Sequence, residues 1–244
     1  MSSIILPDTS LCAIVRDEKM NPAGGIERFV DSHVPYVEQA VIADTGSVDG
    51  TREILEEMQA KYSNLKVVDI PFTGYADSRN KALKYVKTKR VLVLDADELL
   101  THEKPQNDWD ILKEFIETNF SKAYRFFFEV ILPERIIPQS TSGHTLRLFD
   151  KDARFSFKNQ LWEKLETRGK ISDCWIDNIQ IKHFVPSRSS TAIKWNNWYL
   201  DSFSGTKGGE ISDEERVEYW KIPPSMREGF QIWKNFNPKR NNYL

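Results

Sequence analysis

Short apolar runs alternate with segments of helical period over residues 10–94, and this alternation restricts the fold more than any other feature. Four runs have the length and composition of buried strands, at 10–15, 40–43, 66–70 and 90–94. Two segments between them, 50–62 and 76–86, carry apolar side chains along one helical stripe. Strands separated by helices are typical of crossover units around a parallel sheet. We therefore expect an α/β fold with a mostly parallel central sheet flanked by helices.

The pattern changes after residue 104. One helix is expected near 108–119, and strand-like stretches follow it at 122–132, 144–150, 153–157 and 174–184. The Pro- and Ser-rich stretch 133–143 predicts an exposed loop. The second half of the chain is therefore expected to add mixed strands to the sheet. Aromatic residues at helical spacing return from residue 188, and we expect a helical C-terminal extension over 206–244.

Composition excludes several classes of protein. The chain has 244 residues, of which 40% are hydrophobic, and this is enough for one large core. A formal net charge of −2 provides no broad basic field for nucleic acid. Two cysteines in a chain of this length do not make a disulfide framework. A reduced, cytoplasmic setting is therefore expected. No stretch approaches the roughly 18 apolar residues of a membrane-spanning helix, so we expect a soluble protein, free or peripheral at a membrane surface.

Acidic residues stand at the ends of three of the four predicted strands. The first strand leads into Asp17 and Glu18, and the second leads into Asp44. The fourth leads into Asp95 and Asp97. Ligands bind at the carboxyl edge of an open parallel sheet, and gathered carboxylates cost free energy unless cations or hydrogen-bond donors accompany them. The sequence therefore predicts a ligand site at this edge.

The second strand is followed by the sequence DTGSVDGT, residues 44–51. Gly46 and Gly50 permit tight backbone geometry, and Asp49 is placed to cap a helix that begins near Gly50. Asp44 has two readings: it caps the turn, or it accepts a hydrogen bond from the N–H edge of a purine or pyrimidine base. The residues alone leave both open.

Asp95 and Asp97 limit the geometry of the fourth strand tip. Side chains on an extended strand alternate faces, so the two carboxylates reach one ion only if the chain leaves strand geometry after Leu94. Oxygen ligands two residues apart then suit Mg²⁺ or Mn²⁺, which keeps water and binds a diphosphate as well. Ordinary solvated charge is the alternative, and the position directly after VLVL favours metal or ligand binding.

Four stretches, SLCAIVRDE, VIADTGSVDGT, ADSRNKAL and VLVLDADE, together resemble the nucleotide-sugar-binding half of the family 2 inverting glycosyltransferases, which adopt the GT-A fold. The likeness covers residues 10–104 and continues more weakly through RLFDKDARF, LWEKL and IKHF. It implies a domain over 1–205, with a nucleotide-sugar-binding half (1–104) and an acceptor half (105–205). It also implies transfer of a sugar from a nucleoside diphosphate, UDP by default, to a hydroxyl of a saccharide or glycoconjugate acceptor with inversion.

The resemblance implies roles for the residues of the first half. Val15, Asp17 and Glu18 would line the nucleotide pocket, and Asp44 would bond the base. Arg79 would approach the base or the diphosphate, because its planar fork suits phosphate oxygens.

The resemblance further implies Mn²⁺ or Mg²⁺ as a cofactor. Asp97 would ligate the ion, while Asp95 would contact the ribose, metal-bound water or the ion itself. His183 lies where such enzymes carry a late histidine and would complete the metal shell. A core histidine satisfied by backbone groups is the alternative for His183.

An inverting reaction needs a carboxylate that takes the proton of the acceptor hydroxyl on the face opposite the leaving group. Glu163 in LWEKL is the candidate base, because it falls where family members often show a His-Glu pair. Here Trp162 stands in place of the histidine, and it is a candidate for stacking on an acceptor sugar. Alternative bases are Glu98, Asp150 and Asp152.

Two other functions stay open. The missing histidine before Glu163 leaves room for a non-catalytic nucleotide-sugar-binding module. A haloacid-dehalogenase-type phosphatase also places D-x-D after an apolar strand, but it does so in the first strand rather than the fourth. The residues name neither the sugar nor the acceptor, and they leave the oligomeric state open.

Overall fold

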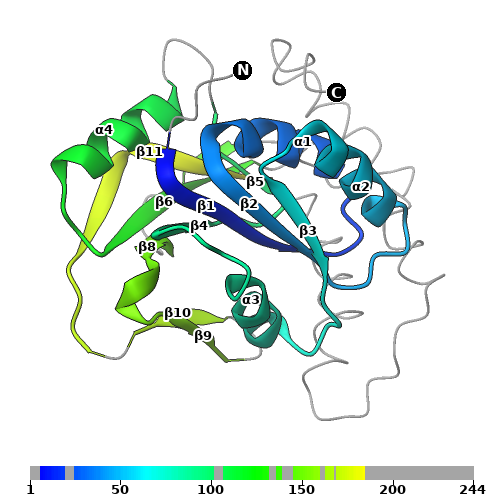
Figure 1. Cartoon of the computed structure of the whole chain (residues 1–244). Coiled ribbons are helices and arrows are strands. Elements are labelled where there is room, and N and C mark those ends of the chain that lie inside the picture. The colour runs from blue at the N-terminus through cyan, green and yellow to red at the C-terminus, as the bar shows by residue number, and fades with distance from the viewer. Residues whose placement is uncertain are drawn as a thin grey trace.

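The computed structural model describes residues 6–19, 25–101, 107–131, 136–138, 145–159, 163–167 and 169–184. Within these residues, nine strands form one curved sheet and two short strands form a second, smaller one. Helices α1, α2 and α4 run along one side of the large sheet, and α3 lies on the other side with the small sheet (Figure 1). In this described part, no helix is long and apolar enough to cross a lipid bilayer.

The first half of the chain alternates strands and helices as expected. Its elements are β1 Leu6–Val15, α1 Gly25–His33, η1 Val34–Tyr36, β2 Val37–Asp44, α2 Thr51–Lys61, β3 Leu65–Asp69, α3 Tyr75–Leu83 and β4 Arg90–Val93. The four predicted strands and both predicted helices are confirmed. The first helix, α1, was not assigned a range from the sequence, and it buries Ile26, Phe29 and Val30 completely at helical spacing.

Strand order brings the expected acidic tips together. The sheet begins β3-β2-β1-β4, and β1 pairs in parallel with both β2 and β4. The carboxyl ends of β1, β2 and β4 are therefore neighbours, although residues 45–89, which include β3, separate β2 from β4 in the chain. Such a reversal of strand order is the place where open α/β sheets bind ligands.

The second half adds a mixed part to the same sheet. Its elements are β5 Glu98–Leu99, α4 Asp108–Thr118, β6 Ala123–Ile131, β7 Ile136–Pro138, β8 Thr145–Asp150, η2 Lys151–Ala153, β9 Ser156–Lys158, β10 Lys164–Glu166 and β11 Asp173–Phe184. The sheet continues from β4 through β8, β6, β11 and β5. β8 runs antiparallel to β4 and β6, whereas β11 runs parallel to β6. The predicted α/β fold with mixed strands in its second half is confirmed.

Two local expectations need correction. The stretch predicted as an exposed loop, 133–143, contains β7, which pairs antiparallel with β6 and places Ile136 opposite Ile131. Pro138 ends this strand, at a sheet edge where proline is tolerated. The strand expected at 153–157 begins only at Ser156, because η2 precedes it. The helices expected from residue 188 and the extension over 206–244 lie outside the described residues.

Two apolar clusters fill the faces of the sheet, because side chains alternate along each strand. Leu11 and Ala13 of β1 pack into the cluster that includes α1, α2 and α4. Cys12, between them, packs into the second cluster with Ala82 of α3 and Phe157 of β9. The sheet is thus covered on both faces, and its open edge is left to the loops that follow the strands.

Candidate active site

The loops after β1 and β2 are joined by hydrogen bonds between each other's backbone and side chains. The Asp17 N–H donates to Ser47 Oγ at 2.9 Å, and the Val48 N–H donates to Asp17 Oδ1 at 2.7 Å. The Glu18 N–H donates to Thr51 Oγ1 at 2.7 Å. These bonds join the two acidic strand tips into one loop pair.

Asp44 caps the turn, which is one of the two readings left open by the sequence. Its Oδ1 accepts the N–H groups of Gly46 and Ser47 at 2.8 and 2.9 Å, so the carboxylate does cap the turn. Its Oδ2 is buried and has no hydrogen-bond partner among the described residues. One oxygen is therefore structural, and the other is available to a donor from a ligand.

Asp17 presents a second buried oxygen in the same loop pair. The residue is fully buried, it adopts a left-handed backbone conformation at φ 55°, and its Oδ2 has no partner within the described residues. Burial raises the pKa of Asp17 to about 6; the bond from Val48 opposes this, and the charges of Asp49 and Asp44 add to it. Asp17 and Asp44 thus each have one buried oxygen without a hydrogen-bond donor among the described residues. Such a pair points to a ligand that carries N–H groups.

Val15, Asp49 and Gly50, next to these acidic residues, stabilise the conformation of the two loops. Val15 is buried in the cluster under α1, and its carbonyl accepts the N–H and the hydroxyl of Thr45, each at 3.0 Å. Asp49 accepts the Thr51 N–H at 2.9 Å and so caps the start of α2, as expected. Gly50 has φ 97°, a left-handed conformation that favours glycine.

The chain leaves strand geometry at the end of β4, as two converging aspartates require. β4 ends at Val93, and residues 95–98 form a turn that is closed by a 2.9 Å bond from the Glu98 N–H to the Asp95 carbonyl. We call these four residues the 95–98 turn. Its carboxylates face different partners: Asp95 contacts arginines, whereas Asp97 contacts a histidine.

Arg79 of α3 joins Asp95 to Glu163. Its Nη2 donates to Asp95 Oδ1 at 2.5 Å and its Nε donates to Glu163 Oε1 at 2.7 Å. The side chain is 7% exposed and lies over the ring of Phe157 at 5.5 Å. Burial by itself lowers the pKa of Arg79, but Asp95 and Glu163 outweigh it and hold the pKa above its usual value. The candidate base, the candidate phosphate-binding arginine and the D-x-D motif therefore share one cluster.

Arg147 of β8 completes this cluster, and the sequence did not single it out. Its Nη2 donates to Asp95 Oδ2 at 3.3 Å and also to Glu98 Oε1. Burial tends to raise the pKa of Asp95, but Arg79 and then Arg147 hold it well below its usual range. The available signal was an arginine inside the otherwise apolar strand stretch TLRLF. That signal does not say which carboxylate the arginine meets.

Glu98, an alternative base, is only 2% exposed on its side chain. Its Oε2 accepts the Asp95 N–H at 3.0 Å, and Arg147 occupies its Oε1. Burial raises the pKa of Glu98 to about 7, with Arg147 opposing the rise. A carboxylate enclosed in this way supports the turn and has no open approach for an acceptor hydroxyl.

His183 of β11 faces Asp97. β11 pairs antiparallel with β5 and sets His183 opposite Glu98, and the His183 Nε2 lies 3.5 Å from Asp97 Oδ2. Burial alone lowers the pKa of His183, but Asp97 outweighs it and raises the pKa to about 9. His183 is 36% exposed and has a carboxylate partner, so it is not a core histidine satisfied by backbone groups.

Asp97 and His183 make a partial set of metal ligands. Among the described residues, no group of three or more His, Cys, Asp or Glu side chains is arranged to hold an ion. Mg²⁺ and Mn²⁺ are commonly bound through one or two protein ligands, with water and substrate phosphates in the remaining positions. The residues therefore fit a divalent cation whose shell is completed by a diphosphate. Asp95, held by two arginines, lies beside this pair.

The other alternative bases lie elsewhere. Asp150 pairs with Lys122 at 2.9 Å and with Arg90, the first residue of β4, so it lies at the far end of that strand from Asp95. Asp152 is exposed and also contacts Lys122. Trp162 lies outside the described residues.

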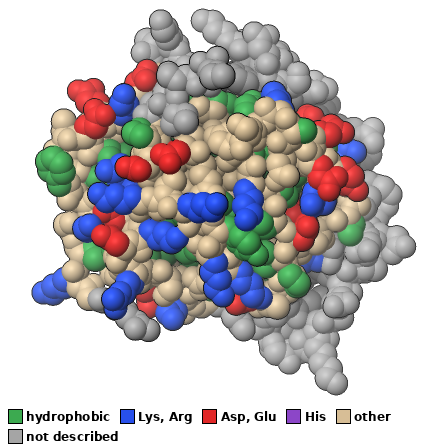
Figure 2. Space-filling model, viewed as in Figure 1, with side chains coloured by type: hydrophobic (Ala, Val, Ile, Leu, Met, Phe, Trp, Pro, Cys, Tyr) green, Lys and Arg blue, Asp and Glu red, His purple; other side chains and the backbone are tan. Residues whose placement is uncertain are grey.

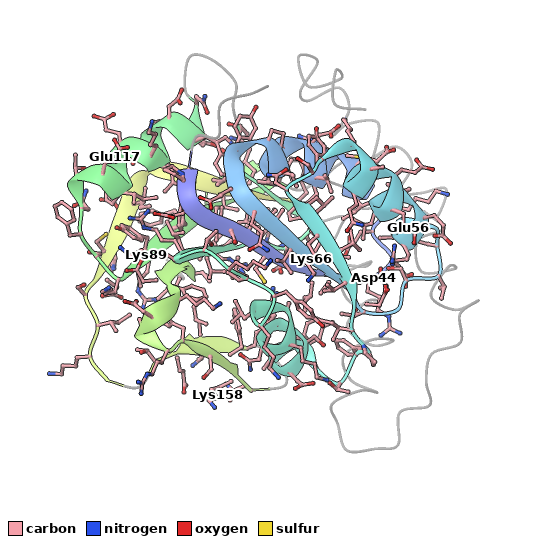
Figure 3. The ribbon with its side chains drawn as sticks, in the orientation of Figure 1. Asp44, Glu56, Lys66, Lys89, Glu117 and Lys158 are labelled. Atoms are coloured by element: carbon pink, nitrogen blue, oxygen red, sulfur yellow. The ribbon has the colours of Figure 1, made fainter. Side chains whose placement is uncertain are left out.

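A cavity of about 480 Å³ opens beside Asp150, lined by residues that include Lys89 and Glu117. Figure 3 shows Lys89 and Glu117 on the left of the molecule and Asp44 on the right. On the face drawn in Figure 2, basic side chains occupy the middle and acidic ones lie mainly toward the left and right. The cavity is not lined by Arg79, Asp95 or Glu163. The candidate active site is therefore identified from these buried charged side chains and not from the cavity.

Solved structures that share the fold are GT-A glycosyltransferases. S. aureus TarS 1–349 matches with a TM-score of 0.54 and 16% identity, over 96% of this chain and 73% of that one. The same TarS fragment in complex with UDP-GlcNAc gives 0.50 and 15%, over 94% and 74%. The mannosyltransferase PcManGT from Pyrobaculum calidifontis, in complex with GDP-Man and Mn²⁺, gives 0.53 and 13%, over 96% and 75%. At these identities the likeness establishes the fold.

The family itself follows from the sequence match. The model of glycosyl transferase family 2 matches residues 21–176, which is more than half of the chain, and the chain therefore belongs to that family. No curated protein gives a significant sequence match.

Proposed function

We propose that the chain transfers a sugar from a nucleoside diphosphate donor, with a UDP-sugar favoured, to a hydroxyl of a saccharide or glycoconjugate acceptor. The proposed reaction inverts the anomeric carbon and depends on Mn²⁺ or Mg²⁺. The observation that carries the proposal is the pair of bonds from Arg79 to Asp95 and Glu163, residues far apart in the chain. It links the candidate phosphate-binding side chain to the candidate base beside the 95–98 turn.

We assign the nucleobase of the sugar donor to the loop pair after β1 and β2. Asp17 and Asp44 each offer a buried carboxylate oxygen without a donor among the described residues. The imide or amide edge of a nucleobase supplies N–H donors that would satisfy these oxygens. Such pairing discriminates strongly, because a ligand without the donor leaves the carboxylate desolvated and unpaired.

The leaving diphosphate is assigned to Arg79 and to the position beside Asp97 and His183. Breaking the bond between the sugar and the phosphate builds negative charge on the diphosphate, and a buried guanidinium stabilises that charge effectively. A divalent cation, when bound, supplies Lewis-acid stabilisation of the same charge. Asp97 and His183 would hold it, and Asp95 would orient Arg79.

Glu163 is assigned as the base. Its side chain is 16% exposed, and the bond from Arg79 Nε fixes one of its oxygens. The second oxygen makes no hydrogen bond with the described residues, and we assign it to accept the proton of an acceptor hydroxyl. For inversion, that hydroxyl approaches the anomeric carbon on the face opposite the diphosphate.

The direct test measures the products released from UDP-, dTDP- and GDP-sugars, with and without acceptor saccharides and Mn²⁺. An inverting glycosyltransferase releases the nucleoside diphosphate and forms a product with the opposite anomeric configuration, whereas a retaining one releases it and keeps the configuration. A phosphatase releases inorganic phosphate instead. A non-catalytic binding module releases nothing, although the nucleotide sugar raises its Tm.

Glu163→Gln separates the base from donor binding. We expect the variant to lose about 10²–10⁴-fold in kcat, the usual contribution of a positioned general base, while donor affinity stays near that of the wild type. Glu166→Gln, on the exposed side of β10, is the matched control. Equal kcat in the wild type and Glu163→Gln would remove Glu163 from the base role.

A further inference from the structure

Arg147 connects the two ends of the 95–98 turn from outside it. The arginine lies on β8, which runs between β4 and β6. A single nitrogen, Nη2, donates both to Asp95 Oδ2 at 3.3 Å and to Glu98 Oε1. The turn is also closed from within, because the Asp95 N–H donates to Glu98 Oε2 and the Glu98 N–H donates to the Asp95 carbonyl.

The Arg147–Glu98 pair is removed from solvent, whereas the Asp95 side chain is 34% exposed. The Glu98 side chain is 2% exposed and the Arg147 side chain is 12% exposed. The guanidinium carbon of Arg147 lies 5.3 Å from the centre of the Phe128 ring, which covers one of its faces. Ion pairs that exclude water hold one geometry, because moving either partner away leaves a buried charge without a counter-charge.

The three carboxylates of the turn, Asp95, Asp97 and Glu98, therefore have different partners. Asp95 and Glu98 are both bound by Arg147, and Asp95 is bound by Arg79 as well. Asp97, between them, instead lies 3.5 Å from His183 Nε2, and its carbonyl accepts the Phe184 N–H at 2.9 Å. Without Arg147, three carboxylates within four residues would repel one another, and a cation would have several competing ligands.

We propose that Arg147 is a positioning residue for the reaction. By holding Asp95 and Glu98, it leaves Asp97 as the carboxylate of the turn that faces His183 and a divalent cation. It also keeps Asp95 as the acceptor that orients Arg79. The inference rests on the proposed function, because it assigns Arg147 a role toward the cation and the donor diphosphate of that same site.

A coupling measurement tests this role better than activity alone. Removing a positive charge by Arg147→Met strengthens the attraction of cations to the turn in general, so the affinity for Mn²⁺ by itself does not report on position. The informative quantity is the factor by which Mn²⁺ tightens the binding of UDP, measured by calorimetry with and without the metal. It would be large only if Asp97 and His183 held the cation next to the diphosphate.

We expect this factor to fall by about 10–100-fold in Arg147→Met, the usual cost of losing a group that orients metal ligands. Arg147→Lys should retain part of it, because one nitrogen makes both contacts and an ammonium can replace that nitrogen. Arg125→Met, which removes an arginine paired with Asp173 on the neighbouring strand, is the matched control and should leave the factor unchanged.

A double variant separates positioning from stability. Arg147→Met leaves Glu98 buried without its cation, and Glu98→Gln removes that uncompensated charge. The double variant should therefore regain Tm without regaining the coupling between Mn²⁺ and UDP. If the coupling returns in full, Arg147 only neutralises Glu98, and the inference is wrong.

The remaining outcomes distinguish this inference from the proposed function. If Mn²⁺ tightens UDP binding equally in the wild type and in Arg147→Met, the positioning role alone is overturned. If Mn²⁺ has no effect on nucleotide binding by the wild type, the proposed metal dependence is overturned, and the role of Arg147 toward the metal is overturned with it.

Discussion

Asp17 gives the sharpest prediction about pH. The side chain is fully buried, one oxygen accepts the Val48 N–H at 2.7 Å, and the other has no partner within the described residues. Burial therefore raises the pKa of Asp17 from 3.8 to about 6. The substitution Asp17→Asn keeps the size of the side chain and an oxygen for Val48, but it removes the titration.

The sign and size follow from the two pKa values. The folded state binds this proton more tightly than the unfolded chain does, so the free energy of unfolding falls as pH rises from about 4 to about 6. Above that range Asp17 makes no further contribution to the slope. A tenfold change in proton affinity is about 1.4 kcal/mol, so the total loss attributable to Asp17 is about 3 kcal/mol.

Urea unfolding between about pH 4 and about pH 8 measures this loss. The wild type should become less stable relative to Asp17→Asn by about 3 kcal/mol across that range, and a constant offset from the new amide drops out of the comparison. Asp177→Asn, on an exposed position of β11, should track the wild type. A stability difference between Asp17→Asn and the wild type that is flat with pH would refute the reasoning.

Two further predictions concern the charged cluster. Arg79→Met should abolish transfer and lower the free energy of unfolding by about 3–5 kcal/mol, because it leaves Glu163 without its buried counter-charge and Asp95 with Arg147 alone. Arg52→Met, which breaks a more exposed pair with Asp69, should cost at most about 1 kcal/mol in the same urea titration. Asp97→Ala should remove the Mn²⁺-dependent part of the rise in Tm produced by a nucleoside diphosphate, while the metal-independent part remains; an undiminished Mn²⁺-dependent part would show that the cation binds elsewhere.

Some site residues were predictable because local patterns place them. An apolar run followed by acids marks a strand tip, and parallel strands share the edge at which those tips lie. Asp17, Asp44 and Asp95 were accordingly expected at one edge, and the order β3-β2-β1-β4 confirms it. The resemblance added Arg79 and Glu163, which the structure joins directly. Their assigned roles in catalysis stay predictions.

Other elements and contacts could not be predicted from local sequence patterns. Strands β5 and β10 contain two and three residues, which is too short for a period to be recognised. Arg147 stood in a predicted strand, but its partners depend on β8 running antiparallel beside β4. Nothing in the local sequence specifies that pairing, because strand register is set by contacts between distant segments.

The sequence by itself determined the α/β class, the four strands of the first half and the acidic residues at their tips, because each depends on the spacing of side chains along a short segment. Tertiary structure decided which charged side chains pair with one another. It directs Asp95 to two arginines and Asp97 to His183, and it encloses Glu98. Those choices follow from the order and direction of strands and from burial, which makes an unpaired charge costly and so selects one set of partners.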